Sequence, residues 1–206
     1  MGFDIPAIRA LMRRDFAAIR RSRAIVIPMV LVPTMMLVFM PAMISYAARG
    51  ADPSTANRLL ESLPEGLADP VNALPEAERL VVLVNRYMLA PLFLIVPLMV
   101  SAVLAADAFA GEKERKTLES LLHLPIRERD IYIAKLLVAF VPAVLVSWLG
   151  FFAFAIVVNS ITWPVLGRIL IPDVAWAILI LWVAPATAAL GLGIMVRVSA
   201  RSRNTQ

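Results

Sequence analysis

One stretch of the chain decides its fold class: residues 136–158 read LLVAFVPAVLVSWLGFFAFAIVV and contain no Lys, Arg, Asp or Glu. A helix rises about 1.5 Å per residue, so roughly 20 apolar residues cross the ~30 Å hydrocarbon core of a bilayer. Three other stretches have the same character, at residues 24–48, 88–106 and 174–196. The sequence therefore predicts an all-α integral membrane protein with four transmembrane helices.

The composition of the whole chain agrees with a membrane protein. Its 206 residues are 61% hydrophobic and only 17% charged, and the mean hydropathy is +0.81, well outside the usage of soluble domains. The absence of cysteine excludes disulfides, Cys-ligated metals and a thiol nucleophile. His123 is the single histidine, which removes most His-based catalytic relays. We therefore expect no enzyme activity, no cofactor and no metal site in this chain.

The basic residues predict the orientation, because cytoplasmic segments of membrane proteins carry an excess of Lys and Arg. Segments 1–23, 107–135 and 197–206 hold 15 of the 20 basic residues, whereas segments 49–87 and 159–173 hold five. This split predicts a multi-pass protein of the plasma (cytoplasmic) membrane with both termini in the cytoplasm and an extracytoplasmic loop at 49–87. Since the basic residues are divided among membrane-proximal segments, no nucleic-acid partner is expected.

Residues 1–23 have the pattern of an amphipathic helix at the membrane surface. Asp4 and Pro6 are a plausible N-cap and first-turn proline. Apolar residues recur at steps of three and four, as Ile5, Ile8, Met12, Phe16 and Ile19. Arginines occupy the other faces and are predicted to meet anionic lipid at the bilayer surface: Arg9, Arg13, Arg14, Arg20 and Arg21. The pattern leaves open whether this helix only sets topology or also contacts a partner.

Two further features predict local structure. The loop at 49–87 is rich in proline and suggests short helices at 56–63 and 76–86, without metal-ligand spacing. In the fourth predicted helix, small residues favour close helix packing, namely Ala184, Ala188, Ala189, Gly191 and Gly193.

The segment 107–135, between the second and third predicted helices, carries the strongest functional signal. Six acids and six bases alternate along it, so it has no net charge but offers many ion-pair partners. Leu118, Leu121 and Leu122 form an apolar edge at helical spacing, and Pro125 ends that predicted helix. The segment is either a solvated turn or a docking surface for a cytoplasmic protein, and the dense patterning favours docking.

At these residues the sequence resembles the membrane (permease) subunits of ABC-2 type exporters. The resemblance rests on Gly111-Glu112-Lys113-Glu114, Lys116-Thr117-Leu118-Glu119, Leu121-Leu122, Pro125, Arg127, Arg129 and Ala134-Lys135. It extends more weakly to the N-terminal segment, which matches the amphipathic "elbow" helix of that family. In the family, the loop after the second membrane helix is the coupling element that sits on an ATP-binding subunit. The resemblance thus implies a partner-binding role for Glu112, Glu114, Thr117, Leu118, Glu119, Leu121 and Leu122.

The resemblance also implies partners and a mechanism. No G-x-x-x-x-G-K-[ST] motif is present, so ATP is expected to bind to a separate P-loop subunit. A second permease, identical or related, would complete a homodimer or heterodimer in the lipid bilayer. Such subunits usually have six membrane helices, whereas this chain offers four and ends at Gln206. We therefore expect two further helices to be missing from the sequence.

Two other functions remain open at this stage. A non-transporting membrane scaffold or accessory protein would share the loop pattern without forming a pathway. A secondary transporter would need ionisable groups or broken helices near the bilayer midplane, and the four apolar stretches contain no charged residue. The sequence therefore favours a permease subunit that couples ATP hydrolysis by another subunit to movement of a substrate.

Overall fold

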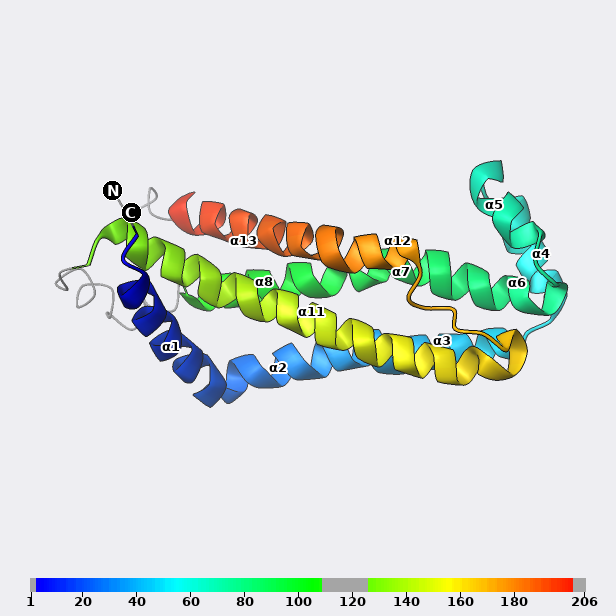
Figure 1. Cartoon of the computed structure of the whole chain (residues 1–206), viewed down its shortest axis with the longest axis horizontal. Coiled ribbons are helices and arrows are strands. Elements are labelled where there is room, and N and C mark those ends of the chain that lie inside the picture. Colours follow the sequence, from blue (N-terminus) through cyan, green and yellow to red (C-terminus); the bar gives the residue numbers. More distant parts are fainter. Residues whose placement is uncertain (1–2, 109–125, 202–206) are drawn as a thin grey trace. The chain divides into compact units, whose positions relative to one another are not determined.

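The computed structural model describes residues 3–108 and 126–201 (Figure 1). Within these ranges the chain forms helices and no strand, which confirms the all-α fold class. Four helical stretches of the described chain are long and apolar enough to cross a membrane: Arg23–Arg49, Glu76–Ala106, Glu128–Leu166 and Val174–Ser199. They correspond to the four predicted helices.

The second and third stretches are longer than their apolar segments suggest. The short helix predicted at 76–86 continues into the predicted transmembrane helix at 88–106. The second stretch therefore begins at Glu76. The third stretch begins at Glu128 and ends at Leu166 instead of covering only 136–158. Hydropathy detects the part of a helix that suits lipid, but backbone hydrogen bonding continues into polar residues at either end. The connecting segments are correspondingly shorter than 49–87 and 107–135.

Three of the four stretches contain a π-helical segment. The first is built from α2 (Arg23–Thr34), η1 (Met35–Phe39) and α3 (Met40–Arg49). The second consists of α6 (Glu76–Val82), η2 (Leu83–Met88), α7 (Leu89–Phe93) and α8 (Ile95–Ala106). The third is the single helix α11 (Glu128–Leu166), and the fourth combines α12 (Val174–Ile178), η4 (Leu179–Val183) and α13 (Ala184–Arg201).

Proline explains where these π-helical segments occur. Pro41, Pro91 and Pro185 each lie two or three residues after one of them. A proline has no N–H for the carbonyl four residues earlier, and its ring clashes with that carbonyl. In all three cases that carbonyl belongs to the π-helical segment, where the wider turn relieves the clash. Pro142 lies inside α11 without such a segment, so proline favours this adjustment but does not enforce it.

The described residues group into two compact units. Unit 1 comprises Met1–Val32, Val96–Ser147 and Ala184–Gln206, and unit 2 comprises Pro33–Ile95 and Trp148–Val183. In unit 1, α8 and α13 cross closely at Gly191. A Cβ atom at this position would lie 2.6 Å from the Leu98 carbonyl oxygen, so only glycine fits. Of the predicted small-residue face, Ala184 and Ala188 are buried, whereas Ala189 is exposed and Gly193 has no neighbour within 4 Å of such an atom.

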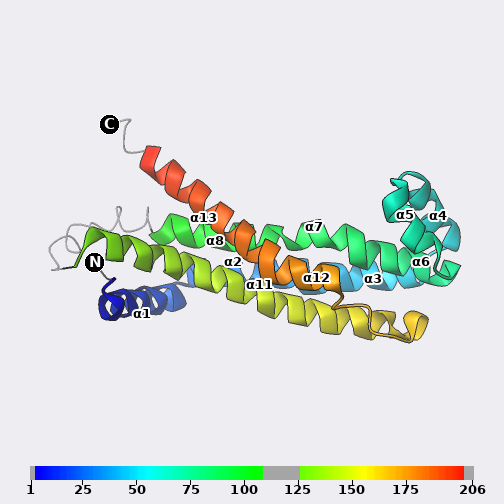
Figure 2. The same cartoon turned by 45° about the horizontal axis from the view of Figure 1, so that its top comes forward.

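Unit 2 contains an aromatic cluster and a helical hairpin. Phe93, Phe151 and Phe154 surround Trp176, with the Phe154 and Trp176 ring centroids 4.9 Å apart. Helices α4 (Pro53–Glu61) and α5 (Glu65–Asn72) lie against α6 (Figure 2). The sequence predicts a helix close to α4 but not α5, because a glycine and a proline interrupt that segment.

The first turn of α4 is capped by an acidic side chain. Asp52 Oδ1 accepts a hydrogen bond from the backbone N–H of Ser54 at 2.8 Å. This backbone bond, together with the Ser54 hydroxyl, lowers the pKa of the Asp52 carboxyl below its usual range. A group with a lowered pKa stabilises the fold while it is ionised, so this cap weakens as the pH falls through the acidic range.

One polar contact joins the first and second membrane stretches inside unit 2. The Ser45 hydroxyl donates a hydrogen bond to Asn85 Oδ1 at 2.7 Å. The Asn85 amide donates to the Val81 carbonyl of its own helix at 2.9 Å, and both side chains are fully buried. Polar side chains that meet in this way hold membrane helices together.

We expect Ser45→Ala to lower the free energy of unfolding by about 1 kcal/mol, because it removes an interhelical bond and leaves the buried Asn85 oxygen without its donor. Unfolding in mixed detergent micelles measures the effect. Ser160→Ala is the matched control, since the Ser160 hydroxyl donates only to the Ile156 carbonyl of its own helix. Equal destabilisation by both substitutions would contradict a role for the Ser45 contact in joining the helices.

Candidate functional site

The residues predicted to bind a partner lie in the segment 109–125, outside the described residues. These are Glu112, Glu114, Thr117, Leu118, Glu119, Leu121 and Leu122. The structure describes the residues on both sides of the segment, which we call the loop base: Asp107 and Ala108 before it, and 126–135 after it. All of them belong to unit 1, together with α1 (Ile5–Arg21).

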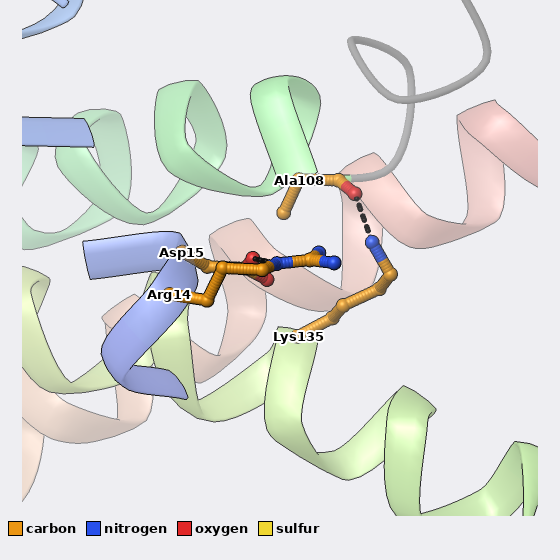
Figure 3. Close-up of polar contacts among 4 residues, drawn as sticks. All are labelled: Arg14, Asp15, Ala108 and Lys135. Carbon is orange, nitrogen blue, oxygen red and sulfur yellow. Dashed lines mark hydrogen bonds and ion pairs between the residues drawn. The ribbon is translucent and has the colours of Figure 1, made fainter. Parts of the chain in front are cut away.

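A buried lysine joins the two ends of the loop base. The Lys135 ammonium donates a hydrogen bond to the carbonyl oxygen of Ala108 at 2.9 Å (Figure 3). Ala108 is the last described residue before the segment 109–125, and Lys135 lies in the second turn of α11. The Lys135 side chain is only 5% exposed, and a charged donor in such surroundings makes a stronger bond than a neutral one. The contact therefore joins Ala108, at the end of the second membrane stretch, to α11.

Helix α1 packs against the returning side of the loop base. Ile8 and Leu11 of α1 form a buried cluster with Ala134 of α11. Partly buried apolar side chains surround this cluster, namely Met12, Ile126, Ile131, Ile133 and Leu137. The N-terminal helix therefore does more than carry charge, because it covers the first turns of α11.

The start of α1 agrees with the sequence prediction, and its apolar face differs slightly. Asp4 caps the helix by accepting a hydrogen bond from the Ala7 N–H at 3.0 Å. Ile5, predicted on the apolar face, is 70% exposed, and Leu11 is buried instead. A helix has 3.6 residues per turn, and α1 packs against α11 on one side. The stripe of buried residues on α1 is therefore narrower than the apolar face that the sequence pattern suggests.

The five arginines of α1 that were predicted to meet lipid are all exposed in the structure: Arg9, Arg13, Arg14, Arg20 and Arg21. Arg14 also pairs with its neighbour Asp15, with 2.8 Å between Nε and Oδ1 (Figure 3). A pair of neighbouring residues at the surface, here with an exposed arginine, contributes little to stability. Exposure is compatible with contact to anionic lipid, and that contact stays a prediction.

Asp130 is a buried acid in the loop base that the sequence analysis did not single out. Its side chain is 0% exposed, and among the described residues neither carboxylate oxygen has a hydrogen-bond partner. The Arg129 Nε lies 3.9 Å from Oδ1. Asp130 stands in the first turn of α11, where the positive end of the helix dipole favours an acid.

The position of Asp130 could have been found from helical periodicity. Ala134 and Val138 are buried four and eight residues later, so the buried stripe of α11 extends back to residue 130. In the sequence, Asp130 counts only as one acid in an alternating run.

The residue before Asp130 contacts the beginning of the chain. The Arg129 guanidinium lies 4.3 Å from the centroid of the Phe3 ring, which links residue 3 to α11.

The described residues contain no group of three or more His, Asp or Glu that could hold a metal ion. The loop base thus offers one buried lysine, one buried acid and an apolar contact between α1 and α11.

Comparison with known families shows what kind of protein this is. The family model described as "ABC-2 family transporter protein" matches residues 9–206, almost the whole chain. The chain belongs to the ABC-2 transporter family. The predicted resemblance is thereby confirmed, and the chain is a multi-pass membrane component of permease type. No curated protein and no solved structure matches it. In the ABC-2 family the transmembrane component has no ATP site of its own.

Proposed function

We propose that the chain is the permease subunit of an ATP-driven exporter in the plasma membrane. In this proposal a separate P-loop subunit hydrolyses ATP, and the segment 109–125 docks on it. Both termini and this segment face the cytoplasm, and a second permease, identical or related, completes the pathway as a homodimer or heterodimer. Membership of the ABC-2 family supports the permease role, and the alternating charges of the segment 107–135 support docking.

The observation that carries the proposal is the bond between Lys135 and the Ala108 carbonyl. Because this bond ties α11 to the end of the second membrane stretch, a push on the segment 109–125 acts on both helices together. The packing of Ile8 and Leu11 against Ala134 adds α1 to the same group. Closely packed helices move as rigid bodies and do not deform continuously. Unit 1 is therefore suited to convert movement of a docked subunit into helix movement.

The proposed docking surface has both charged and apolar parts. Glu112, Glu114 and Glu119 would pair with basic residues of the ATP-binding subunit. Leu118, Leu121 and Leu122 would fill an apolar groove, where a few buried residues carry most of the binding energy. Thr117 directly precedes Leu118 in the sequence.

The test is reconstitution with the ATPase that co-purifies with the wild-type chain. An exporter subunit changes the rate of ATP hydrolysis in the complex, and its substrate moves only when ATP is supplied. A scaffold would bind the ATPase without transport. Transport driven by an ion gradient in the absence of ATP would contradict the proposal and favour a secondary transporter.

The proposed orientation gives a separate prediction. The chain has no native cysteine, so single cysteines report topology without background. We expect Ser54→Cys and Ile169→Cys to react with a membrane-impermeant thiol reagent added to whole cells, since the proposal places both residues outside. Ser120→Cys should react only after the cells are opened. Reaction of Ser120→Cys in intact cells, with protection of the other two, would reverse the orientation.

A further inference from the structure

A cavity of about 270 Å³ opens in unit 2 where three segments meet. The segments are α5, the second membrane stretch around η2, and the connection between α11 and α12. Val71, Leu74 and Leu170 form part of its apolar wall. The charged residues that line it are Arg86, Arg168 and Asp173. The cavity thus combines an apolar surface with two guanidinium groups that come from different segments.

Carboxylates hold both arginines in place. The Arg86 Nε lies 2.6 Å from Asp173 Oδ2. Arg168 pairs with Glu78, which is mostly buried and does not line the cavity. A guanidinium has five N–H donors, and within the described ranges the remaining nitrogens of Arg86 and Arg168 have no hydrogen-bond partner. Arg86 is oriented by Asp173 and by the Tyr87 ring, whose centroid lies 5.7 Å from the guanidinium carbon, and Arg168 is oriented by Glu78. Both arginines keep further donors for a ligand.

The spare N–H donors of the two arginines favour an anion, since the charges of Arg86, Asp173, Arg168 and Glu78 cancel in pairs. The acid that lines the cavity, Asp173, accepts a hydrogen bond at Oδ1 only, from the backbone N–H of Trp176 at 2.8 Å. Its Oδ2 faces Arg86 as an ion pair without a hydrogen bond among the described residues. Guanidinium groups match the geometry of phosphate and carboxylate oxygens. Because the arginines are held in position beforehand, a ligand loses little affinity in ordering them.

We propose that this cavity binds an anionic amphipath, with its phosphate or carboxylate at Arg86 and Arg168 and an apolar part against Val71, Leu74 and Leu170. The volume suits a small headgroup with the beginning of a chain. Such a group can belong to a membrane phospholipid or to a soluble amphipathic anion. This inference goes beyond the proposed coupling to an ATPase and does not depend on it.

The test uses Ile169→Cys as a local reporter in the full chain, purified in a neutral detergent. Ile169 lines the cavity and is 68% exposed, so a bound ligand should slow thiol modification there. The probes are short-chain phosphatidylglycerol, short-chain phosphatidylcholine, hexyl phosphate and inorganic phosphate. We expect one or both of the anionic amphipaths to protect the cysteine. Protection by phosphatidylglycerol alone identifies a lipid ligand, and protection by hexyl phosphate alone identifies a soluble one.

Substitutions in the same background test the two parts of the cavity. Arg168→Gln should raise the concentration needed for protection about tenfold, because it removes a charge-assisted contact. Arg58→Gln is the control, since Arg58 is an exposed residue of α4 that does not line the cavity. Leu74→Trp keeps both arginines, fills the apolar wall and should also weaken protection.

Four results would overturn the inference. Equal protection by phosphatidylcholine and phosphatidylglycerol would contradict the anionic specificity. Equal protection by inorganic phosphate and hexyl phosphate would contradict the apolar part. Protection that Arg168→Gln and Leu74→Trp both leave unchanged would place the ligand elsewhere. No protection by any probe would exclude the site.

Discussion

Glu119→Lys is expected to prevent binding of the ATP-binding subunit while the chain still inserts into the membrane. In the proposed interface Glu119 pairs with a basic residue of the ATP-binding subunit, so the substitution brings two positive charges together. Like charges brought together at an interface cost several kcal/mol, which corresponds to about a hundredfold weaker association or more. Co-purification of the ATPase and its rate of hydrolysis in the complex measure the effect.

Two control variants separate repulsion from other causes. Glu119→Gln removes the charge without reversing it, and we expect a smaller loss of binding. Glu61→Lys makes the same charge reversal at an exposed residue of α4, which the proposed topology places on the opposite side of the membrane. If Glu119→Lys retains full association and full ATPase regulation, then the segment 109–125 is a solvated turn and not a docking surface.

The helices that cross the membrane could be predicted from the sequence because one physical requirement dominates them. A span needs about 20 apolar residues, and charged residues are excluded from its centre. The residues 136–158 satisfy this condition without ambiguity. The N-cap at Asp4 could also be predicted, because capping depends on residues that are close in the sequence.

Features that depend on contacts between distant residues could not be predicted in the same way. The sequence predicts the helix start at Glu76, but the close approach of Gly191 to the Leu98 carbonyl depends on a residue far away along the chain. The cavity near Arg86 requires a connection more than 80 residues later to fold back on the second membrane stretch. By contrast, the segments η1, η2 and η4 have a local contribution, since the carbonyl four residues before Pro41, Pro91 or Pro185 falls inside them, although Pro142 shows that a proline alone does not produce such a segment.

The residues of the loop base could be predicted from the sequence only in part. The resemblance to the ABC-2 family drew attention to Ala134 and Lys135 as the end of a motif, but it gave no physical reason for them. The structure supplies one, since Ala134 packs under α1 and the Lys135 ammonium reaches Ala108 across the base of the loop. A small residue is needed where two helices approach closely, and a long cationic side chain is needed to reach the Ala108 carbonyl. Both residues therefore have a structural role in the loop base, next to the segment that we propose to dock on the ATP-binding subunit.

Lys135→Met is expected to uncouple ATP hydrolysis from transport without preventing membrane insertion. Methionine keeps most of the side-chain volume of lysine but removes the ammonium that bonds the Ala108 carbonyl. The loss of a buried, charge-assisted hydrogen bond amounts to about 1.5–3 kcal/mol, so we expect coupling to fall by about tenfold to a hundredfold. The measurement is the number of substrate molecules moved per ATP hydrolysed in reconstituted vesicles.

The control for this substitution is Arg197→Met, which removes an exposed cation of α13 within the same unit. It should leave the ratio of transport to hydrolysis unchanged, because no described contact of Arg197 holds the loop base. The thermal stability of both variants must be measured together with transport, since burial of Lys135 also supports the fold. If Lys135→Met lowers only the melting temperature and each folded complex still moves as much substrate per ATP, then the Lys135 bond is structural and the proposed path of force through the loop base is wrong.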